Sequence, residues 1–227
     1  MKLMKKATLG LSVIGLSLTL GACGNNNDSK DDGKTTTMAQ VLNGKEERKI
    51  AMTYDDGHGN SPTIQWAGTI GNGKVNIHPY SYYNKELKDF EFNEIKNENM
   101  KDYKALLKKR SDEYSEQKGK KLDIKPEKAK LIYGQEDEAE KAKYVGLFYN
   151  AKAYDREEKR LMRNMEYSVV EKNHPENWLE IRTKDKSGKG WTQYHMWVEA
   201  KGNEKNLELE NLKDVEKNYD NYHIIQE

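Results

Sequence analysis

Two places in this 227-residue chain hold side chains that could do chemistry. The first is the pair Asp55 and Asp56, where one carboxylate could act as a base on water bound to a metal that the other holds. The second is Cys23, the only thiol in the sequence, which directly follows an apolar N-terminal stretch. Acyl chains on a thiol at that position would anchor the protein to a bilayer. The aspartate pair therefore points to hydrolysis, and the thiol points to a location in the cell.

The aspartate pair lies in IAMTYDDGHG, residues 50–59, an apolar segment that ends in Asp-Asp-Gly. This segment resembles the first motif of polysaccharide deacetylases, a family with a deformed α/β barrel. The resemblance implies that Asp55 is the base and Asp56 a ligand of a divalent metal. That family completes its metal site with two histidines separated by three residues, and no pair among the five histidines here has that spacing. A strand followed by an Asp-Gly turn explains the same residues, and we favour that interpretation.

The thiol lies at the end of a leader with the three parts of an export signal. Three lysines occur among the first six residues, and an uncharged apolar stretch follows at residues 7–20. The run Leu-Gly-Ala-Cys at residues 20–23 resembles the lipobox of bacterial lipoproteins, which implies cleavage before Cys23 and a diacylglycerol on its sulfur. We therefore predict a signal peptide over residues 1–22 and lipidation of Cys23. An ordinary secretory signal is the other interpretation.

The segment after the thiol is polar and predicts a tether. Residues 24–37 read GNNNDSKDDGKTTT, without one apolar side chain, so residues 23–37 are expected to be a lipidated cysteine and a disordered linker with a reach of roughly 20 Å. Loss of residues 1–22 would remove three lysines and no acidic residue, which leaves 36 basic and 38 acidic side chains. Because this balance offers no basic excess, we expect no nucleic-acid partner.

The first part of residues 38–227 has the pattern of an antiparallel sheet with a helix. Apolar residues alternate in four short segments that predict strands, at residues 50–54, 64–70, 75–77 and 90–95. Gly71-Asn72-Gly73 predicts a tight hairpin turn between two of them, because Asn and Gly tolerate positive φ. Apolar residues at helical spacing then predict an amphipathic helix from Asn99 to Gly119, packed on the strands.

The second part repeats this pattern. Further strands are predicted at residues 131–133, 145–149, 165–169, 179–181 and 191–198. A helix over residues 212–222 closes the chain. Runs of antiparallel strands closed by helices predict the α+β class, with antiparallel β-meanders packed against one or two amphipathic helices. Two similar halves, 38–120 and 121–227, and one continuous sheet both fit this pattern.

Aromatic residues supply a candidate binding surface. Trp191, His195 and Trp197 share one face of the strand predicted over residues 191–198. The four tryptophans and 14 tyrosines could form a platform for glycans or peptides, because such residues are favoured at recognition surfaces. The alternative, which we favour, is that they fill the core of a chain with only three phenylalanines.

These features predict a lipid-anchored protein on the extracytoplasmic face of the cell membrane that acts by binding. Frequent Asn, Lys and Tyr favour a low-GC Gram-positive host. The expected partners are the membrane, through Cys23, and an envelope or extracellular protein or glycan. We expect no catalytic residue, metal or cofactor, and the alternative is an envelope hydrolase that uses Asp55 and Asp56. A transporter solute-binding protein fits least, because the chain is short and its strands run antiparallel.

Overall fold

A computed structural model of the chain describes residues 33–55, 61–80, 89–119, 121–150, 159–161, 177–184 and 191–226. All of its described elements belong to the unit Asp32–Glu227. In chain order they are β1 (Lys34–Thr37), α1 (Met38–Asn43), β2 (Arg48–Tyr54), β3 (Thr63–Gly71), β4 (Lys74–Pro79), the 3₁₀ helix η1 (Phe92–Glu94), α2 (Met100–Lys118), β5 (Glu127–Gln135), β6 (Tyr144–Asn150), β7 (Lys159–Leu161), β8 (Trp178–Lys184), β9 (Trp191–Glu199), β10 (Glu204–Glu208), α3 (Leu212–Asn218) and β11 (Tyr222–Gln226). None of these helices is long and apolar enough to cross a bilayer.

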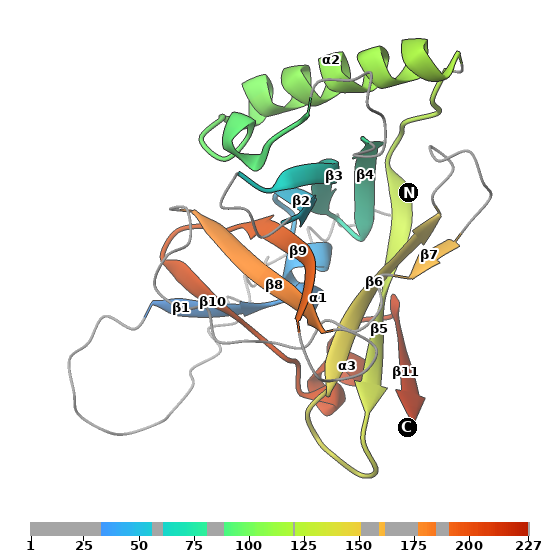
Figure 1. Cartoon of the computed structure of the whole chain (residues 1–227). Coiled ribbons are helices and arrows are strands. Elements are labelled where there is room, and N and C mark those ends of the chain that lie inside the picture. The colour runs from blue at the N-terminus through green and yellow to red at the C-terminus, as the bar shows by residue number, and fades with distance from the viewer. Residues whose placement is uncertain are drawn as a thin grey trace, which may run out of the picture. The chain divides into compact units, whose positions relative to one another are not determined.

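One nine-stranded sheet organises the described elements (Figure 1). Its strand order is β7-β6-β5-β4-β3-β2-β9-β8, and β11 lies beside β5. Neighbouring strands are antiparallel except β11, which runs parallel to β5. A separate parallel pair joins β1 to β10. The predicted α+β class, with antiparallel strands packed against helices, is confirmed.

The sheet buries apolar side chains on both faces. Along β2, Ile50 and Met52 belong to the core that includes α1 and α3, whereas Ala51 belongs to the core beneath α2. This division follows from the alternation of side chains along a strand. The α2 residue Tyr103 is fully buried, and its hydroxyl donates to the strand carbonyl oxygens of Ile50 and Gly68 at 3.0 and 2.8 Å. Helix α2 is therefore fixed to the sheet by packing and by hydrogen bonds.

Local sequence determines the turn and the helix ends that were predicted. Asn72 and Gly73 have φ angles of 53° and 69°, the conformation of the tight hairpin turn expected between β3 and β4. Helix α2 begins after Asn99, whose side-chain oxygen accepts from the backbone N–H of Asp102 at 3.0 Å. It ends at Gly119, which has a φ of 63° and forms the left-handed cap.

Two predictions near the chain ends are wrong. The linker does not extend to residue 37, because β1 (Lys34–Thr37) pairs with β10 and its threonines supply the ladder. The last helix ends at Asn218 rather than at residue 222. Tyr222 instead begins β11, where it is the partner of Leu131 on β5. In both segments, pairing with a strand distant in sequence overrides the local pattern.

The strand predicted over residues 90–95 is also wrong. Phe92–Glu94 form the 3₁₀ helix η1, and only Glu91 makes a β-bridge, to Thr63. Phe90 and Phe92 are two residues apart, as apolar residues of a strand would be, but they enter the core beneath α2 from this irregular segment. The strand predicted over residues 165–169 lies outside the described residues.

The sheet is continuous across the predicted boundary between residues 120 and 121. Strand β4 pairs with β5 across it, and β2 pairs with β9 from the other end of the chain. Of the two arrangements that the sequence left open, the structure shows the single continuous sheet.

Candidate functional site

The aspartate segment lies at the end of a central strand. Asp55 directly follows β2, and Asp56 and His58 lie outside the described residues. Strand β2 lies between β3 and β9 in the antiparallel sheet, an arrangement that differs from the α/β barrel implied by the deacetylase resemblance. In the described part of the chain, no group of three or more histidine, cysteine or carboxylate side chains could hold a metal ion.

Of the three residues predicted to form an aromatic surface on β9, Trp197 lies in the core. Trp197 is 7% exposed, stacks on Phe92 with ring centroids 4.7 Å apart and donates to Thr53 Oγ1 at 2.8 Å. His195 is partly exposed and lies parallel to Trp197, with centroids 6.2 Å apart. The side chain of Trp191 lies outside the described residues. Trp197 therefore adds packing to the core and little exposed area to a recognition surface.

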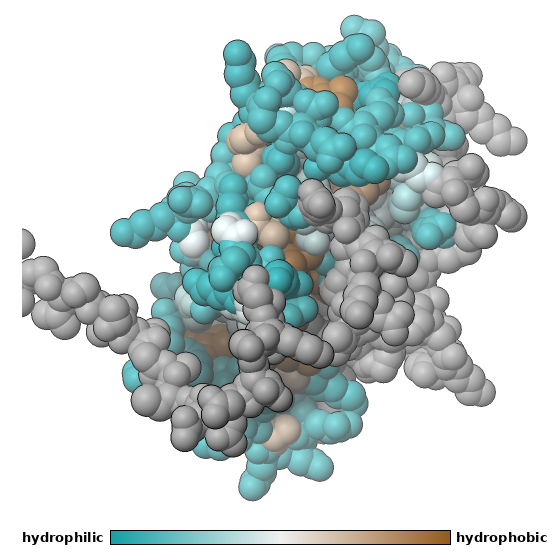
Figure 2. Space-filling model, turned by 90° about the vertical axis from the view of Figure 1, so that its left-hand side faces the viewer, coloured by the Kyte–Doolittle hydropathy of each residue, from teal (hydrophilic) through white to brown (hydrophobic). Residues whose placement is uncertain are grey.

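The other two tryptophans, Trp66 and Trp178, are also buried. On the face shown in Figure 2, the described surface is hydrophilic over most of its area, with only small, separate apolar patches. Among the described residues, the exposed large hydrophobic side chains are Tyr194 and Ile225, and the core-filling interpretation holds for the three buried indoles Trp66, Trp178 and Trp197.

His195 is held in place by a buried carboxylate. Its Nδ1 bonds to the carboxylate of Glu180 on β8, whose side chain is 4% exposed. A carboxylate that orients an imidazole is one element of a catalytic triad. Thr53 is the partner of His195 on the neighbouring strand β2. Its hydroxyl accepts a hydrogen bond from the indole N–H of Trp197 and belongs to the core. Among these residues, the hydrogen bond between His195 and Glu180 therefore serves to join β9 to β8.

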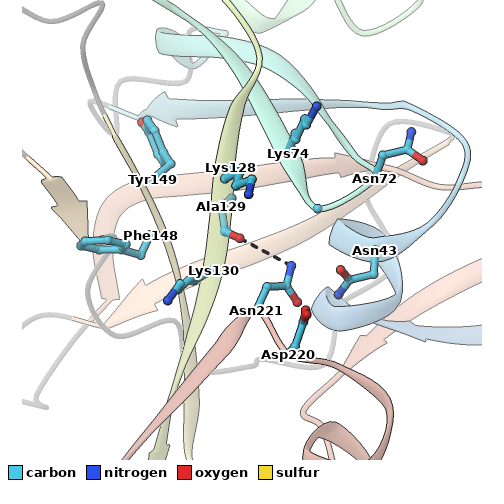
Figure 3. A pocket seen from close by; sticks show the side chains of 11 residues that line it. Asn43, Asn72, Lys74, Lys128, Ala129, Lys130, Phe148, Tyr149, Asp220 and Asn221 are labelled. Carbon is cyan, nitrogen blue, oxygen red and sulfur yellow. Dashed lines mark hydrogen bonds between the residues drawn. The ribbon is translucent and has the colours of Figure 1, made fainter.

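A different site lies where β5 changes its partner strand. A pocket of about 530 Å³ is lined there by residues of α1, the β3–β4 turn, β4, β5, β6 and the segment before β11 (Figure 3). Strands β4 and β5 pair only over two residues of each, Lys74 with Lys128 and Val75 with Glu127. From Leu131 onward, β5 pairs with β11 instead. The pocket lies at this branch in the sheet.

Backbone hydrogen bonds fix the frame of the pocket. Gly73 donates to Leu42 O at 2.8 Å and accepts from the N–H of Ala129 at 3.0 Å, so the β3–β4 turn is tied to both α1 and β5. On the other side, Leu131 donates to Asn221 O at 3.0 Å. Every wall of the pocket is thus bonded to a neighbouring wall, and the cavity is preformed.

Three lysines give the pocket a positive charge. Lys74 on β4 and Lys128 and Lys130 on β5 line it, and Asp220 is the only acidic residue among the described residues of the lining. Within the described residues, none of the three ammonium groups forms an ion pair. Lys74 and Lys128 are directly opposite each other on neighbouring strands, a position in which like charges destabilise a sheet. This arrangement is unfavourable for the protein alone and favourable for binding an anion.

A contrasting cluster shows how lysines are neutralised elsewhere in the fold. Lys49, which is 6% exposed, donates to Glu199 at 2.9 Å and to the carbonyl oxygen of Glu98 at 2.5 Å. Burial raises the pKa of Glu199, but hydrogen bonds from Lys49 and Lys201 outweigh it and hold the pKa below its usual value. Lys49, Glu98 and Glu199 line a second cavity of about 300 Å³, but the charges of Lys49 and Glu199 are already paired with each other.

The sequence analysis missed the lysine pocket. The run Glu-Lys-Ala-Lys-Leu at residues 127–131 has the alternation of a half-exposed strand, which is the signal that was present. Nothing local indicates that Lys74, or Asn221 from the end of the chain, lies beside it. The pocket is created by pairing between distant strands.

No protein-family model, curated protein or solved structure matches the chain. The function of the lysine pocket therefore has to be inferred from its geometry and its charge.

Proposed function

We propose that the chain is a lipid-anchored binding protein on the extracytoplasmic face of the cell membrane, and that its lysine pocket binds an anionic ligand. The anchor is supported by the sequence, in which an export signal ends at a lipobox and Cys23. The binding role is supported by one observation in the fold: three lysines without a carboxylate partner among the described residues surround a preformed pocket.

The size and lining of the pocket suit a small ligand. Its volume of about 530 Å³ lies within the range of roughly 300–1,000 Å³ that is usual for such sites. Lysine ammonium groups bind phosphate or carboxylate as point charges with three donors each. With Asp220 subtracted from the three lysines, the lining keeps an excess of two positive charges. The near-neutral balance of the whole chain does not oppose this local attraction.

Binding is tested by titrating the full chain with inorganic phosphate at low ionic strength, in a polyoxyethylene detergent. We expect saturable binding that weakens as salt is raised, because the attraction is screened. Lys128→Gln should weaken binding by about tenfold, the worth of one charge-assisted hydrogen bond. Lys101→Gln, on the exposed surface of α2, is the matched control and should bind like the wild type. Equal affinity in all three proteins, or no binding at all, would overturn the proposal.

The anchor is tested separately by fractionating cells that express Cys23→Ala. The wild-type chain should be found with the membrane, and mass spectrometry should show acyl chains on its N-terminal cysteine. The variant should be lost from the membrane fraction or retain its leader, whereas the neighbouring change Gly24→Ala should leave acylation intact. An unmodified thiol in the wild type would refute the anchoring part of the proposal.

The hydrolase alternative keeps Asp55 and Asp56 as its candidates, but no observation on the described fold favours it over binding. The transporter solute-binding alternative is opposed by the fold, because the described strands form one mainly antiparallel sheet and a separate two-stranded pair rather than two α/β lobes.

A further inference from the structure

Charge is not the only recognition chemistry in the lysine pocket. Three asparagines line it, Asn43 at the end of α1, Asn72 in the β3–β4 turn and Asn221 before β11 (Figure 3). A carboxamide offers one acceptor oxygen and two donor hydrogens. The two donors can bind the oxygens of an anion, but the acceptor oxygen needs a ligand that also carries a donor. A carboxamide is therefore fully used only by a ligand that carries hydroxyl groups as well as an anionic group.

Asn221 has an unused acceptor. Its Oδ1 is buried and has no hydrogen-bond partner among the described residues. Its Nδ2 makes only a long contact of 3.5 Å to the carbonyl oxygen of Ala129. A buried polar atom without a partner costs about 1–3 kcal/mol, so most such atoms in native proteins are satisfied by a protein group, water or a ligand. Asn221 thus lines the pocket with an unsatisfied carboxamide, whose rotation would bring its acceptor or its donor to a bound molecule.

A second carboxamide lies close to the first. A Cβ atom placed on Gly73 would be 3.6 Å from Asn221 Nδ2 and 3.8 Å from Asn43 Oδ1. Asn43 is held in this orientation because its Nδ2 donates to the carbonyl oxygen of Ala39 at 3.0 Å. A donor and an acceptor thus face the same point above a glycine that has no side chain to fill the space. A hydroxyl, which both donates and accepts, complements this pair.

The pocket also has an apolar wall beside its charges. Phe148 on β6 is half-buried and is the cross-strand partner of Lys130. Figure 3 shows its ring on the β6 side of the pocket, across β5 from the asparagines. An aromatic face next to an ammonium group suits a ligand in which a ring bears an anionic substituent.

We infer that the ligand is a saccharide that carries a phosphate or a carboxylate. The lysines bind the anionic group, the carboxamides of Asn43 and Asn221 bind ring hydroxyls, and Phe148 packs against the sugar ring. This inference rests on the proposed anion-binding function and specifies its ligand. The volume of about 530 Å³ is sufficient for one or two sugar residues.

The test compares glucose 6-phosphate, inorganic phosphate, glucose and uridine monophosphate as probes of the full chain in a polyoxyethylene detergent, which carries no sugar. Glucose 6-phosphate should bind at least about tenfold more tightly than inorganic phosphate, the worth of roughly one or two added hydrogen bonds. Equal affinity for the two would overturn the saccharide inference and leave the anion site standing. Tighter binding of uridine monophosphate would overturn it in favour of a nucleotide. No binding of any anion would overturn both proposals.

Variants of the pocket test the contacts to the sugar and to the anionic group separately. Phe148→Leu keeps an apolar side chain but removes the ring, and Asn43→Ala removes the acceptor near Gly73. Each should abolish most of the advantage of glucose 6-phosphate while leaving phosphate affinity within about twofold, because neither contributes charge. Lys128→Gln should weaken both probes equally. Equal losses for both probes in Phe148→Leu would show a structural effect only and would refute the role of the ring.

Discussion

The facing lysines on β4 and β5 make a prediction that links stability to binding. Lys74 and Lys128 are directly opposite each other in a ladder of only two residue pairs. Opposite charges in such positions stabilise a sheet by roughly 0.2–1 kcal/mol, and like charges destabilise it by a similar amount. Replacing Lys128 by Glu removes a repulsion and creates an attraction. We expect the free energy of unfolding to rise by about 1 kcal/mol.

The size of this effect is measurable by thermal or urea unfolding of the full chain. For a domain of this length, about 1 kcal/mol corresponds to a rise of roughly 2–4 °C in Tm. Because both side chains are exposed, the gain should shrink as the ionic strength is raised above about 0.15 M, where the Debye length is about 8 Å. The same variant should lose phosphate binding, since the pocket would gain a negative charge.

A double-mutant cycle provides the control. Lys74→Glu alone should stabilise the sheet by a similar amount, but Lys74→Glu combined with Lys128→Glu restores a like-charge pair and should lose the gain. Lys128→Gln should lie between the wild type and Lys128→Glu. A Lys128→Glu protein that is no more stable than the wild type, or an additive double variant, would show that the two ammonium groups do not repel each other in the fold.

Three further predictions concern buried polar groups. Tyr103→Phe removes the hydroxyl that bonds to the backbone of β2 and β3 and should cost about 1–3 kcal/mol in urea unfolding, whereas Tyr219→Phe, whose hydroxyl makes no bond among the described residues, should cost little. Burial raises the pKa of Glu210 above its usual value, so stability should fall as pH rises through the interval between the unfolded-state and folded-state pKa values, and Glu210→Gln should remove that slope. Burial lowers the pKa of His78 to about 4, so stability should fall as pH drops from about 6.5 towards 4, and His78→Gln should flatten the curve there. An unchanged pH profile in either variant would contradict the corresponding assignment.

The parts of the fold that the sequence predicted are those with strong local signals. The β3–β4 hairpin was predictable because only residues such as Asn72 and Gly73 adopt positive φ at low cost. Helix α2 was predictable because its apolar face, its cap at Asn99 and its stop at Gly119 agree with one another. The α+β class was predictable from runs of segments with alternating apolar residues, because this pattern does not depend on which strands pair.

The parts that could not be predicted depend on long-range pairing. The threonines of β1 read as a polar linker, and only their pairing with β10 makes them a strand. Phe90 and Phe92 have the spacing of a strand but reach the core from a 3₁₀ segment. The lysine pocket needs β4, β5 and the segment before β11 in one place, and no local pattern in the sequence indicates that these three segments meet.

Strand β1 also determines how the N-terminal end of the described chain is connected to the pocket. If Cys23 is acylated, β1 shortens the segment between the lipid and the first described strand by four residues, Lys34–Thr37, which were expected to belong to the linker. Helix α1 follows immediately, and its six residues span about 9 Å before Asn43 reaches the pocket wall. Only β1 and α1 therefore separate Gly33, where the described chain begins, from the first residue of the pocket lining.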